Sequence, residues 1–176
     1  MHQSRARPDT LRLFYALWPD AATRNQLALL QQDVDGRKVS DANLHLTLAF
    51  LGNQPRELLR QLEGLMHALP VQAFTIDIDH YGYFAKPRIA WVGPSSPPDA
   101  LMQMQRALWQ ALLEAGVPLK PVAGFRPHVT LARDAMRTDR EMQETIEWRV
   151  GTMALVESVA VSGGVQYRVI AGREIK

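Results

Sequence analysis

Two short histidine–threonine motifs carry residue types suited to chemistry on a phosphate. His45 and Thr47 lie in the stretch NLHLTLAFLG, and His128 and Thr130 lie in FRPHVTLAR. On a β-strand, residues two apart point to the same face, so each histidine shares a face with its threonine. Histidine transfers protons near neutral pH, and the stiff threonine side chain presents a hydroxyl donor. Two such pairs around one phosphate would supply an acid, a base and donors to the phosphate oxygens.

Each motif taken alone has a simpler explanation. A single histidine on a strand is usually a structural residue, and threonine is a good strand former. The repetition of the pattern in two similar contexts favours a shared site. Two histidines could also bind a metal, but such sites normally add a third histidine or a carboxylate, and no such ligand spacing appears here. We therefore expect phosphodiester chemistry without a metal or another cofactor.

The elements around the motifs occur in the same order twice. A strand ends near a tryptophan and a proline, a helix follows, and the next strand carries the motif. This internal repeat predicts an α+β fold with two pseudo-symmetric lobes, each an antiparallel sheet with helices on its outer side, and a central cleft between the motifs. The repeated elements are strand 11–18, helix 21–34 and strand 43–52, then strand 88–93, helix 100–116 and strand 125–133.

The remaining segments complete the two lobes. Asp20 can cap the first helix, and Gly36 and Gly52 are expected to end the elements before them. Alternating apolar residues predict strands, and Gly163-Gly164 predicts a hairpin. The further expected elements are helix 56–69, strand 74–84, a helical turn within 139–148, and strands 151–161 and 165–175.

Length and composition bound the class of protein. A chain of 176 residues is expected to form one bilobal domain over residues 11–176, preceded by a disordered basic arm at residues 1–10. The absence of cysteine excludes disulfides, thiolate metal sites and a cysteine nucleophile, and it fits a reducing compartment. The sequence shows neither a secretory signal nor an apolar run long enough for a membrane helix, so we expect no membrane association and a cytoplasmic location.

The net charge is small. The formal value is +2 and the sequence pI is about 9.1. Such a balance permits an anionic substrate, but it lacks the dense lysine and arginine surface of a tight duplex binder.

The motif strands, together with RLFYALWP at residues 12–19, resemble the two-histidine phosphoesterase superfamily. More narrowly, they resemble its RNA 2′,3′-cyclic phosphodiesterases, also called 2′-5′ RNA ligases. The resemblance covers nearly all of the chain after the first ten residues. It implies metal-independent hydrolysis of RNA 2′,3′-cyclic phosphate ends to 2′-phosphates, with tRNA fragments among the candidate substrates. It also implies a 2′-5′ ligase reaction in which a 5′-hydroxyl replaces water. A monomer is expected because one chain completes the cleft.

The resemblance also implies roles for the motif residues. His45 would donate a proton to O3′, and His128 would accept a proton from the attacking water. Thr47 and Thr130 would bind the phosphate oxygens. Four further residues are candidates for contact with phosphate or RNA, each with a surface or core role as the alternative: Arg133 for phosphate, and Phe14, Arg88 and Arg126 for other parts of the substrate.

Two other functions remain open from the sequence. Within the superfamily, the substrate could be a small cyclic phosphate or a 2′-5′-linked oligonucleotide, and a panel of substrates would separate these. Outside it, the chain could be an RNA-binding module without catalysis. A pure binder has no use for two proton-transfer groups, which disfavours this second alternative.

Overall fold

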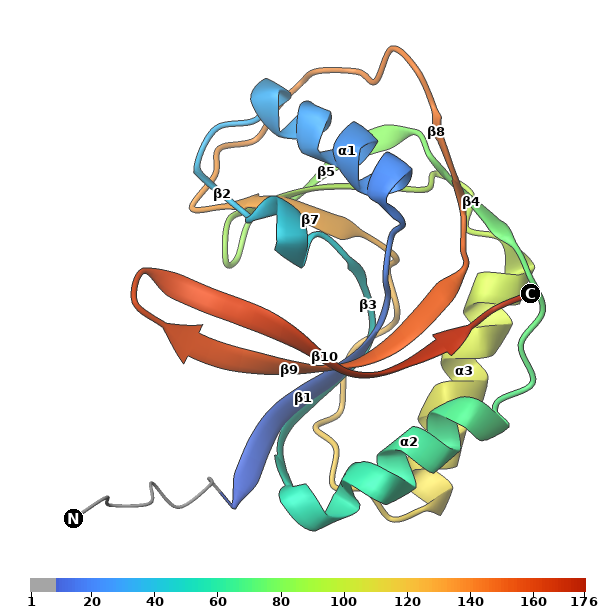
Figure 1. Ribbon diagram of the computed structural model, residues 1–176. Coiled ribbons are helices and arrows are strands. Elements are labelled where there is room, and N and C mark those ends of the chain that lie inside the picture. Colours follow the sequence, from blue (N-terminus) through green and yellow to red (C-terminus); the bar gives the residue numbers. More distant parts are fainter. Residues whose placement is uncertain (1–8) are drawn as a thin grey trace.

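The structure, a computed structural model, describes residues 9–176 (Figure 1). Residues 1–8, most of the expected basic arm, lie outside the described residues. The rest of that arm belongs to the fold, because the first strand begins at Thr10 and the Asp9 carbonyl accepts a hydrogen bond from the Arg56 amide at 3.0 Å. The fold thus begins before residue 11.

One large antiparallel sheet dominates the described part of the chain. Its eight strands are β1 (Thr10–Leu17), β2 (Arg37–Lys38), β3 (Leu46–Pro55), β5 (His80–Phe84), β6 (Ile89–Gly93), β7 (Val129–Arg133), β9 (Thr152–Val161) and β10 (Gly164–Glu174). They lie in the order β10-β9-β1-β3-β7-β6-β5, with β2 paired to β7. β9 and β10 form the expected hairpin.

A small second sheet corrects two expectations. It pairs β4 (Thr75–Ile78) with β8 (Ile146–Arg149). The expected strand 74–84 is therefore two strands in different sheets, divided at Asp79. The helical turn expected within 139–148 is absent, and its last residues form β8 instead. Ile146 and Trp148 are buried while their neighbours are exposed, which is the period of two that a strand requires.

The two halves of the large sheet meet at one residue pair. β3 and β7 are antiparallel neighbours through Leu46 and Val129, the residues that follow the two motif histidines. The α+β class is confirmed, but the expected two sheets are continuous at this point. The strand–helix–strand repeat lies on both sides of the junction, so this pair marks the centre of the repeated architecture.

Three α-helices and three short 3-10 turns accompany the strands in the described residues. The α-helix α1 begins after Asp20, whose carboxylate accepts a hydrogen bond from the Thr23 amide at 2.7 Å, as expected for an N-cap. The helices are α1 (Ala21–Leu30), α2 (Leu59–Ala68) and α3 (Asp99–Glu114), and the turns are η1 (Gln31–Asp33), η2 (Asp41–Asn43) and η3 (Arg56–Leu58).

The helices of the repeat are exchanged between the halves of the sheet. α1 follows β1 in the chain, yet it packs against β7 and β8. α3 follows β6, yet it packs against β3, and α2 packs against α3 and the β9–β10 hairpin. Figure 1 shows α1 over the upper strands and α2 and α3 beside the lower ones. Each half of the sheet is therefore covered by a helix that follows a strand of the other half.

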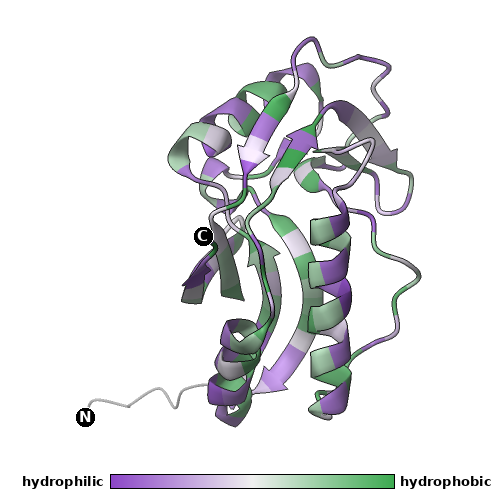
Figure 2. Cartoon of the chain, turned by 90° about the vertical axis from the view of Figure 1, so that its right-hand side faces the viewer, coloured by the Kyte–Doolittle hydropathy of each residue, from purple (hydrophilic) through white to green (hydrophobic). Residues whose placement is uncertain are grey.

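A continuous core joins the halves. Buried apolar residues of both halves form one cluster, and Tyr15 on β1 donates a hydrogen bond to the Leu62 carbonyl on α2 at 2.6 Å. Figure 2 shows hydrophilic and hydrophobic residues mixed along the helices, as expected for elements that bury one face. Each fully buried leucine contributes about 2 kcal/mol relative to an exposed one. This core holds β3 and β7 at the centre of the molecule.

β3 is longer than its sequence pattern indicates. Gly52 was expected to end it, but the strand continues to Pro55. Gly52 has φ of 68°, a conformation open to glycine, and it sits where the pairing of β1 with β3 shifts register. It therefore accommodates a bulge. None of the helices in residues 9–176 is long and apolar enough to cross a membrane.

Candidate active site

His45 stands at the entrance to β3, immediately before the strand begins. Its ring Nδ1 donates a hydrogen bond to the carbonyl oxygen of Asn43 at 2.6 Å. Because a carbonyl only accepts, the proton of the neutral ring resides on Nδ1 and Nε2 carries a lone pair. Nε2 lies 2.9 Å from Oγ1 of Thr47, whose hydroxyl donates to the neutral ring. The two polar side chains of the first motif are thus in direct contact.

His128 is held in the same way at the entrance to β7. Its Nδ1 donates to the carbonyl oxygen of Arg126 at 2.8 Å. In both motifs the acceptor lies two residues before the histidine, so the same local geometry fixes both rings in the same tautomer. Pro127 supports this geometry because a residue before proline favours extended backbone. In the described residues no side chain is hydrogen-bonded to Nε2 of His128, which leaves this nitrogen available to a substrate.

The strand register brings the two motifs together. In an antiparallel pair, residues flanking a matched pair also lie opposite each other and on a common face. Leu46 and Val129 are the matched pair, so each histidine lies opposite the threonine of the other motif. The side chains of both histidine–threonine pairs point to the face of the sheet opposite the two fully buried side chains, Leu46 and Val129. The four polar side chains therefore form a square on one face of the sheet.

A hollow of about 430 Å³ opens beside this square, and we call it the central hollow. Thr47 and His128, from different motifs, both line it. Phe50, Trp109 and Arg126 contribute aromatic and cationic lining. The hollow can therefore hold an aromatic group next to the polar square.

Three aromatic rings enclose His45. Trp18 stacks on it at 5.7 Å between centroids, Phe14 lies tilted at 4.9 Å, and Tyr167 meets it edge-on at 5.1 Å. Tyr167 comes from β10, so the C-terminal hairpin forms one wall of the site. Rings on three sides fix the imidazole and leave it only partly exposed to water.

Two aromatic rings support His128. Phe84 meets it edge-on at 5.0 Å and Trp91 lies tilted at 5.8 Å. The indole of Trp91 lies flat across Gly82, where a Cβ would approach the ring within 2.1 Å. Gly82 is opposite Trp91 in the register, so the absence of a side chain there gives the indole its place.

Burial disfavours charge on both imidazoles. It is the largest cause of the lowered pKa of His45, and the charges of His128 and Arg133 act in the same direction; with the opposing effect of the Asn43 carbonyl included, the pKa falls from 6.5 to about 4. Burial also lowers the pKa of His128, aided by the charges of Arg133 and Arg126. Both rings of the free protein are therefore neutral at pH 7.

A β-bulge turns Arg133 toward the histidines. Thr130 pairs with Trp91 and Ala132 with Ala90, which leaves Leu131 as the extra residue of the bulge. Both Leu131 and Ala132 are buried, and Arg133 emerges on the face of Thr130. Its charge reaches both imidazoles, as their pKa shifts show.

The first motif has the same bulge. Tyr15 pairs with Ala49 and Ala16 with Thr47, which leaves Leu48 as the extra residue. Phe50 consequently occupies the position that Arg133 has in the second motif, and its side chain is 48% exposed. The two halves thus present an aromatic ring on one side of the histidines and a cation on the other.

The other sequence candidates lie in three different environments. Phe14 is only 3% exposed and packs on His45, so its ring supports the imidazole and has little surface left for a base. Arg88 precedes β6, and its guanidinium is 3.6 Å from the Asp134 carboxylate, outside the central hollow. Arg126 lines the central hollow.

Sequence reasoning missed most of the surrounding cage. Trp18 was treated only as the end of a strand, and Tyr167 lies far along the chain from the residue it touches. Asn43 was also missed, although it stands two residues before the histidine, as Arg126 does in the second motif. That shared spacing was the signal available in the sequence.

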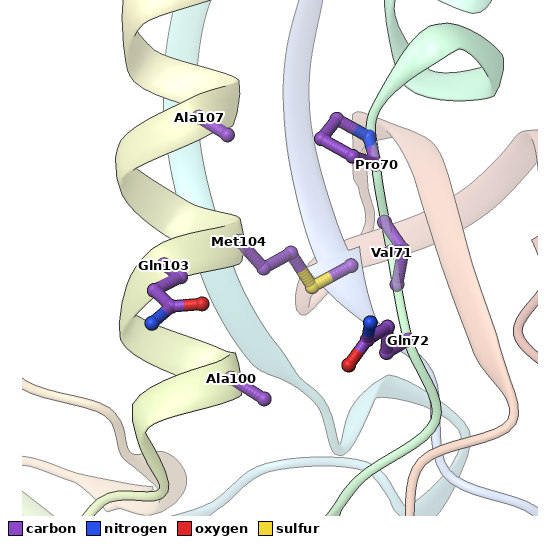
Figure 3. Close-up of a pocket in the computed structure, with 7 residues that line it drawn as sticks. All are labelled: Pro70, Val71, Gln72, Ala100, Gln103, Met104 and Ala107. Atoms are coloured by element: carbon purple, nitrogen blue, oxygen red, sulfur yellow. The ribbon is translucent and has the colours of Figure 1, made fainter.

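Two further findings concern other places in the structure. Residues 9–176 contain no group of three or more histidine, aspartate or glutamate side chains placed to hold a metal ion. A separate hollow of about 420 Å³ between α3 and the segment after α2 contains no ionisable side chain (Figure 3). Its lining residues are Pro70, Val71, Gln72, Ala100, Gln103, Met104 and Ala107.

Known proteins share both the sequence and the fold. An RNA 2′,3′-cyclic phosphodiesterase of Escherichia coli (strain K12) is 35% identical over 128 residues, covering 70% of this chain and 72% of the relative. A Thermus thermophilus protein of the same name is 33% identical, covering 91% and 88%. The crystal structure of E. coli LigT in apo form matches with a TM-score of 0.82 at 28% identity, over 96% of this chain and 99% of that one. Other structures show LigT complexed with 3′-AMP and with phosphate.

The repeated histidine–threonine square, the shared fold and these relatives agree with a match to a family profile. The profile of the 2′-5′ RNA ligase superfamily matches residues 17–161, most of the chain. This protein belongs to the 2′-5′ RNA ligase superfamily.

Proposed function

We propose that this protein is an RNA 2′,3′-cyclic phosphodiesterase, which opens the cyclic phosphate with water and leaves a 2′-phosphate. The observation that carries the proposal is the polar square of two histidines and two threonines at the β3–β7 junction. The relatives that share this name support the substrate class. LigT, with the same fold, is seen with 3′-AMP and with phosphate.

In the proposed reaction the two Nε2 atoms have opposite roles. The water oxygen forms a bond to phosphorus as its proton passes to Nε2 of His128. The bond from phosphorus to O3′ breaks, and O3′ receives a proton from Nε2 of His45. The hydroxyls of Thr47 and Thr130 donate to the non-bridging oxygens, and Arg133 offsets their charge. A second proton exchange with solvent restores the starting state.

Because the pKa of His45 is lowered in the free site, we expect the bound substrate to promote the protonation of this histidine. A donor must be protonated, but the free site disfavours that state because the ring is partly desolvated by burial and the charges of His128 and Arg133 are nearby. A bound anionic phosphate favours a charged imidazolium and screens the arginine. We therefore expect phosphate binding to raise the pKa of His45, so that its imidazole is protonated and can donate this proton to O3′.

The same square supports ligation if a 5′-hydroxyl takes the place of water. In both reactions one proton leaves the attacking oxygen and one reaches O3′ as its bond to phosphorus breaks. Ligase activity is thus the second reaction proposed for this site, with RNA ends as substrates.

The test is a hydrolysis assay on an RNA that ends in a 2′,3′-cyclic phosphate, with a chelator present. We expect a 2′-phosphate product, and rates lower by about a hundredfold or more for His45→Ala and His128→Ala. Unchanged rates in both variants would reject the mechanism. Loss of activity with chelator would point to a metal, and turnover of small cyclic nucleotides but not RNA ends would reject the RNA substrate.

A further inference from the structure

The two catalytic histidines differ in what covers their outer flank. Beside His45, the β9–β10 hairpin closes the site. The Asn43 side chain donates to the Val165 carbonyl at 3.0 Å and accepts from the Tyr167 amide at 3.3 Å, and the Tyr167 ring contacts His45. Asn43 thus fastens a strand over this flank.

The corresponding flank of His128 is open. Arg126 has the position of Asn43, because its carbonyl likewise holds the Nδ1 of the histidine two residues later. On this side the sheet ends at β5, with no counterpart of β10 in the described residues. A hollow of about 590 Å³, which we call the flank hollow, lies there instead. Arg126 and Phe125 line both the flank hollow and the central hollow, so the two lie next to each other.

The flank hollow is built for an anion. Arg126 and Arg137 both line it, and neither guanidinium has an ion pair within residues 9–176. Three arginines outside the hollow are paired instead: Arg37 and Arg88 both contact Asp134, and Arg140 contacts an aspartate on η1. Two free guanidinium groups on one concave surface suit phosphate oxygens.

Three other groups shape this surface. His80 and Ser95 line it, and both are held by Asp79. Its carboxylate accepts from the Ser95 amide at 2.7 Å and contacts Nδ1 of His80 at 3.2 Å. The Asp79 carboxylate is thus already bonded to groups at the edge of the hollow, and Nε2 of His80 remains available to a ligand.

The wall between the flank hollow and the reaction centre has an unused donor. Trp91 lines the hollow, is 4% exposed, and its indole N–H is buried without an acceptor. The ring lies 5.3 Å from His80 and 5.8 Å from His128, between the two imidazoles. Because this nitrogen has almost no accessible surface, a group in the hollow does not reach it in this conformation, and the indole contributes an apolar wall.

We infer that the flank hollow binds the phosphodiester backbone of the RNA on the 5′ side of its terminal nucleotide. The inference rests on the proposed function. With the cyclic phosphate at the polar square, the terminal nucleotide occupies the central hollow, and the chain leaves past Arg126 into the flank hollow. RNA then lies along the flank that β10 covers in the other half. The substrate is therefore an oligonucleotide end, and a mononucleotide uses only part of the site.

The test compares 2′,3′-cyclic AMP with a five-nucleotide RNA that ends in the same cyclic nucleotide. Wild type should have a kcat/KM at least about tenfold higher for the RNA. Arg137→Ala should lower kcat/KM for the RNA about tenfold through KM, and leave cyclic AMP hydrolysis unchanged. The dependence of log kcat/KM for the RNA on log salt should become shallower by about 0.7, the value for one lost single-strand phosphate contact. Arg60→Ala, an exposed arginine on α2, is the matched control.

Each outcome separates this inference from the proposed function. Equal kcat/KM for the two substrates in wild type would overturn the inference and leave the cyclic phosphodiesterase intact. A preference for RNA that survives both Arg137→Ala and Arg137→Glu would also overturn it, because the chain would then follow another path. Hydrolysis of neither substrate would reject the proposed function itself.

Discussion

Replacing His45 with glutamine should weaken the pH dependence of stability in mild acid. Burial lowers the pKa of this histidine from 6.5 to about 4. Between these values the unfolded chain binds a proton that the folded protein does not, so the free energy of unfolding decreases as pH falls through the window. Above 6.5 neither state binds it, and below 4 both do. The gap corresponds to about 3 kcal/mol in full, and to about 2 kcal/mol between pH 7.5 and 5.

Urea unfolding at pH 7.5 and 5, followed by tryptophan fluorescence, measures this difference. Wild type should lose about 2 kcal/mol more than His45→Gln between the two pH values. His67→Gln removes an exposed histidine on α2 and should retain the wild-type difference. Equal pH dependence in wild type and His45→Gln would refute the reasoning that the aromatic cage keeps the imidazole neutral.

A bound anion should partly offset the loss of stability that His45 causes in mild acid. The product mimic 2′-AMP places a phosphate at the polar square and favours the protonated imidazole. Its stabilisation of wild type should therefore be greater at pH 5 than at pH 7.5, and this gain should be absent in His45→Gln. If 2′-AMP stabilises wild type equally at both pH values, its phosphate does not interact with the His45 imidazole.

Three further predictions address the roles of individual residues. A 2′,3′-cyclic substrate with sulfur in place of O3′ has a leaving group that needs no proton, so it should restore much of the rate lost in His45→Ala but not in His128→Ala; the opposite rescue pattern would exchange the two roles. Arg133→Met should raise KM and raise the pKa of His128, seen as an upward shift of its titration by NMR, because a cation near both imidazoles is removed. Gly82→Ala should cost about 1–3 kcal/mol in urea unfolding and lower kcat, since its Cβ would meet the Trp91 indole, whereas Gly64→Ala, with open space on α2, should be neutral or stabilising.

The sequence predicted the features that depend on local pattern. The α+β class followed from alternating and helical periodicities, and the repeated His-x-Thr spacing indicated a shared face before any strand register was known. The N-cap at Asp20 and the Gly163-Gly164 hairpin were also local signals, and both are present. The superfamily inferred from the motif strands is confirmed by the profile match.

Long-range features were not predictable in the same way. Periodicity shows which face of a helix is buried, but not which sheet buries it, so the exchange of α1 and α3 left no trace in the sequence. β8 has only four residues and follows a polar segment, which hid its period of two. The bulges at Leu48 and Leu131 reverse the alternation, so strict alternation would place Arg133 on the face opposite Thr130, whereas the bulge returns it to the same face. The place of Tyr167 depends on a hairpin that folds back from the far end of the chain.

The position of β1 has a consequence for synthesis of the protein. β1 is the first strand made, yet one of its two neighbours in the sheet is β9, which begins at Thr152. Until β9 leaves the ribosome, one edge of β1 has no partner, and the apolar residues that it later buries remain accessible. The large sheet is therefore completed only after β9 and β10 have emerged. A nascent chain stalled before residue 152 should bind chaperones through this open edge of β1, and one extended well beyond β10 should not.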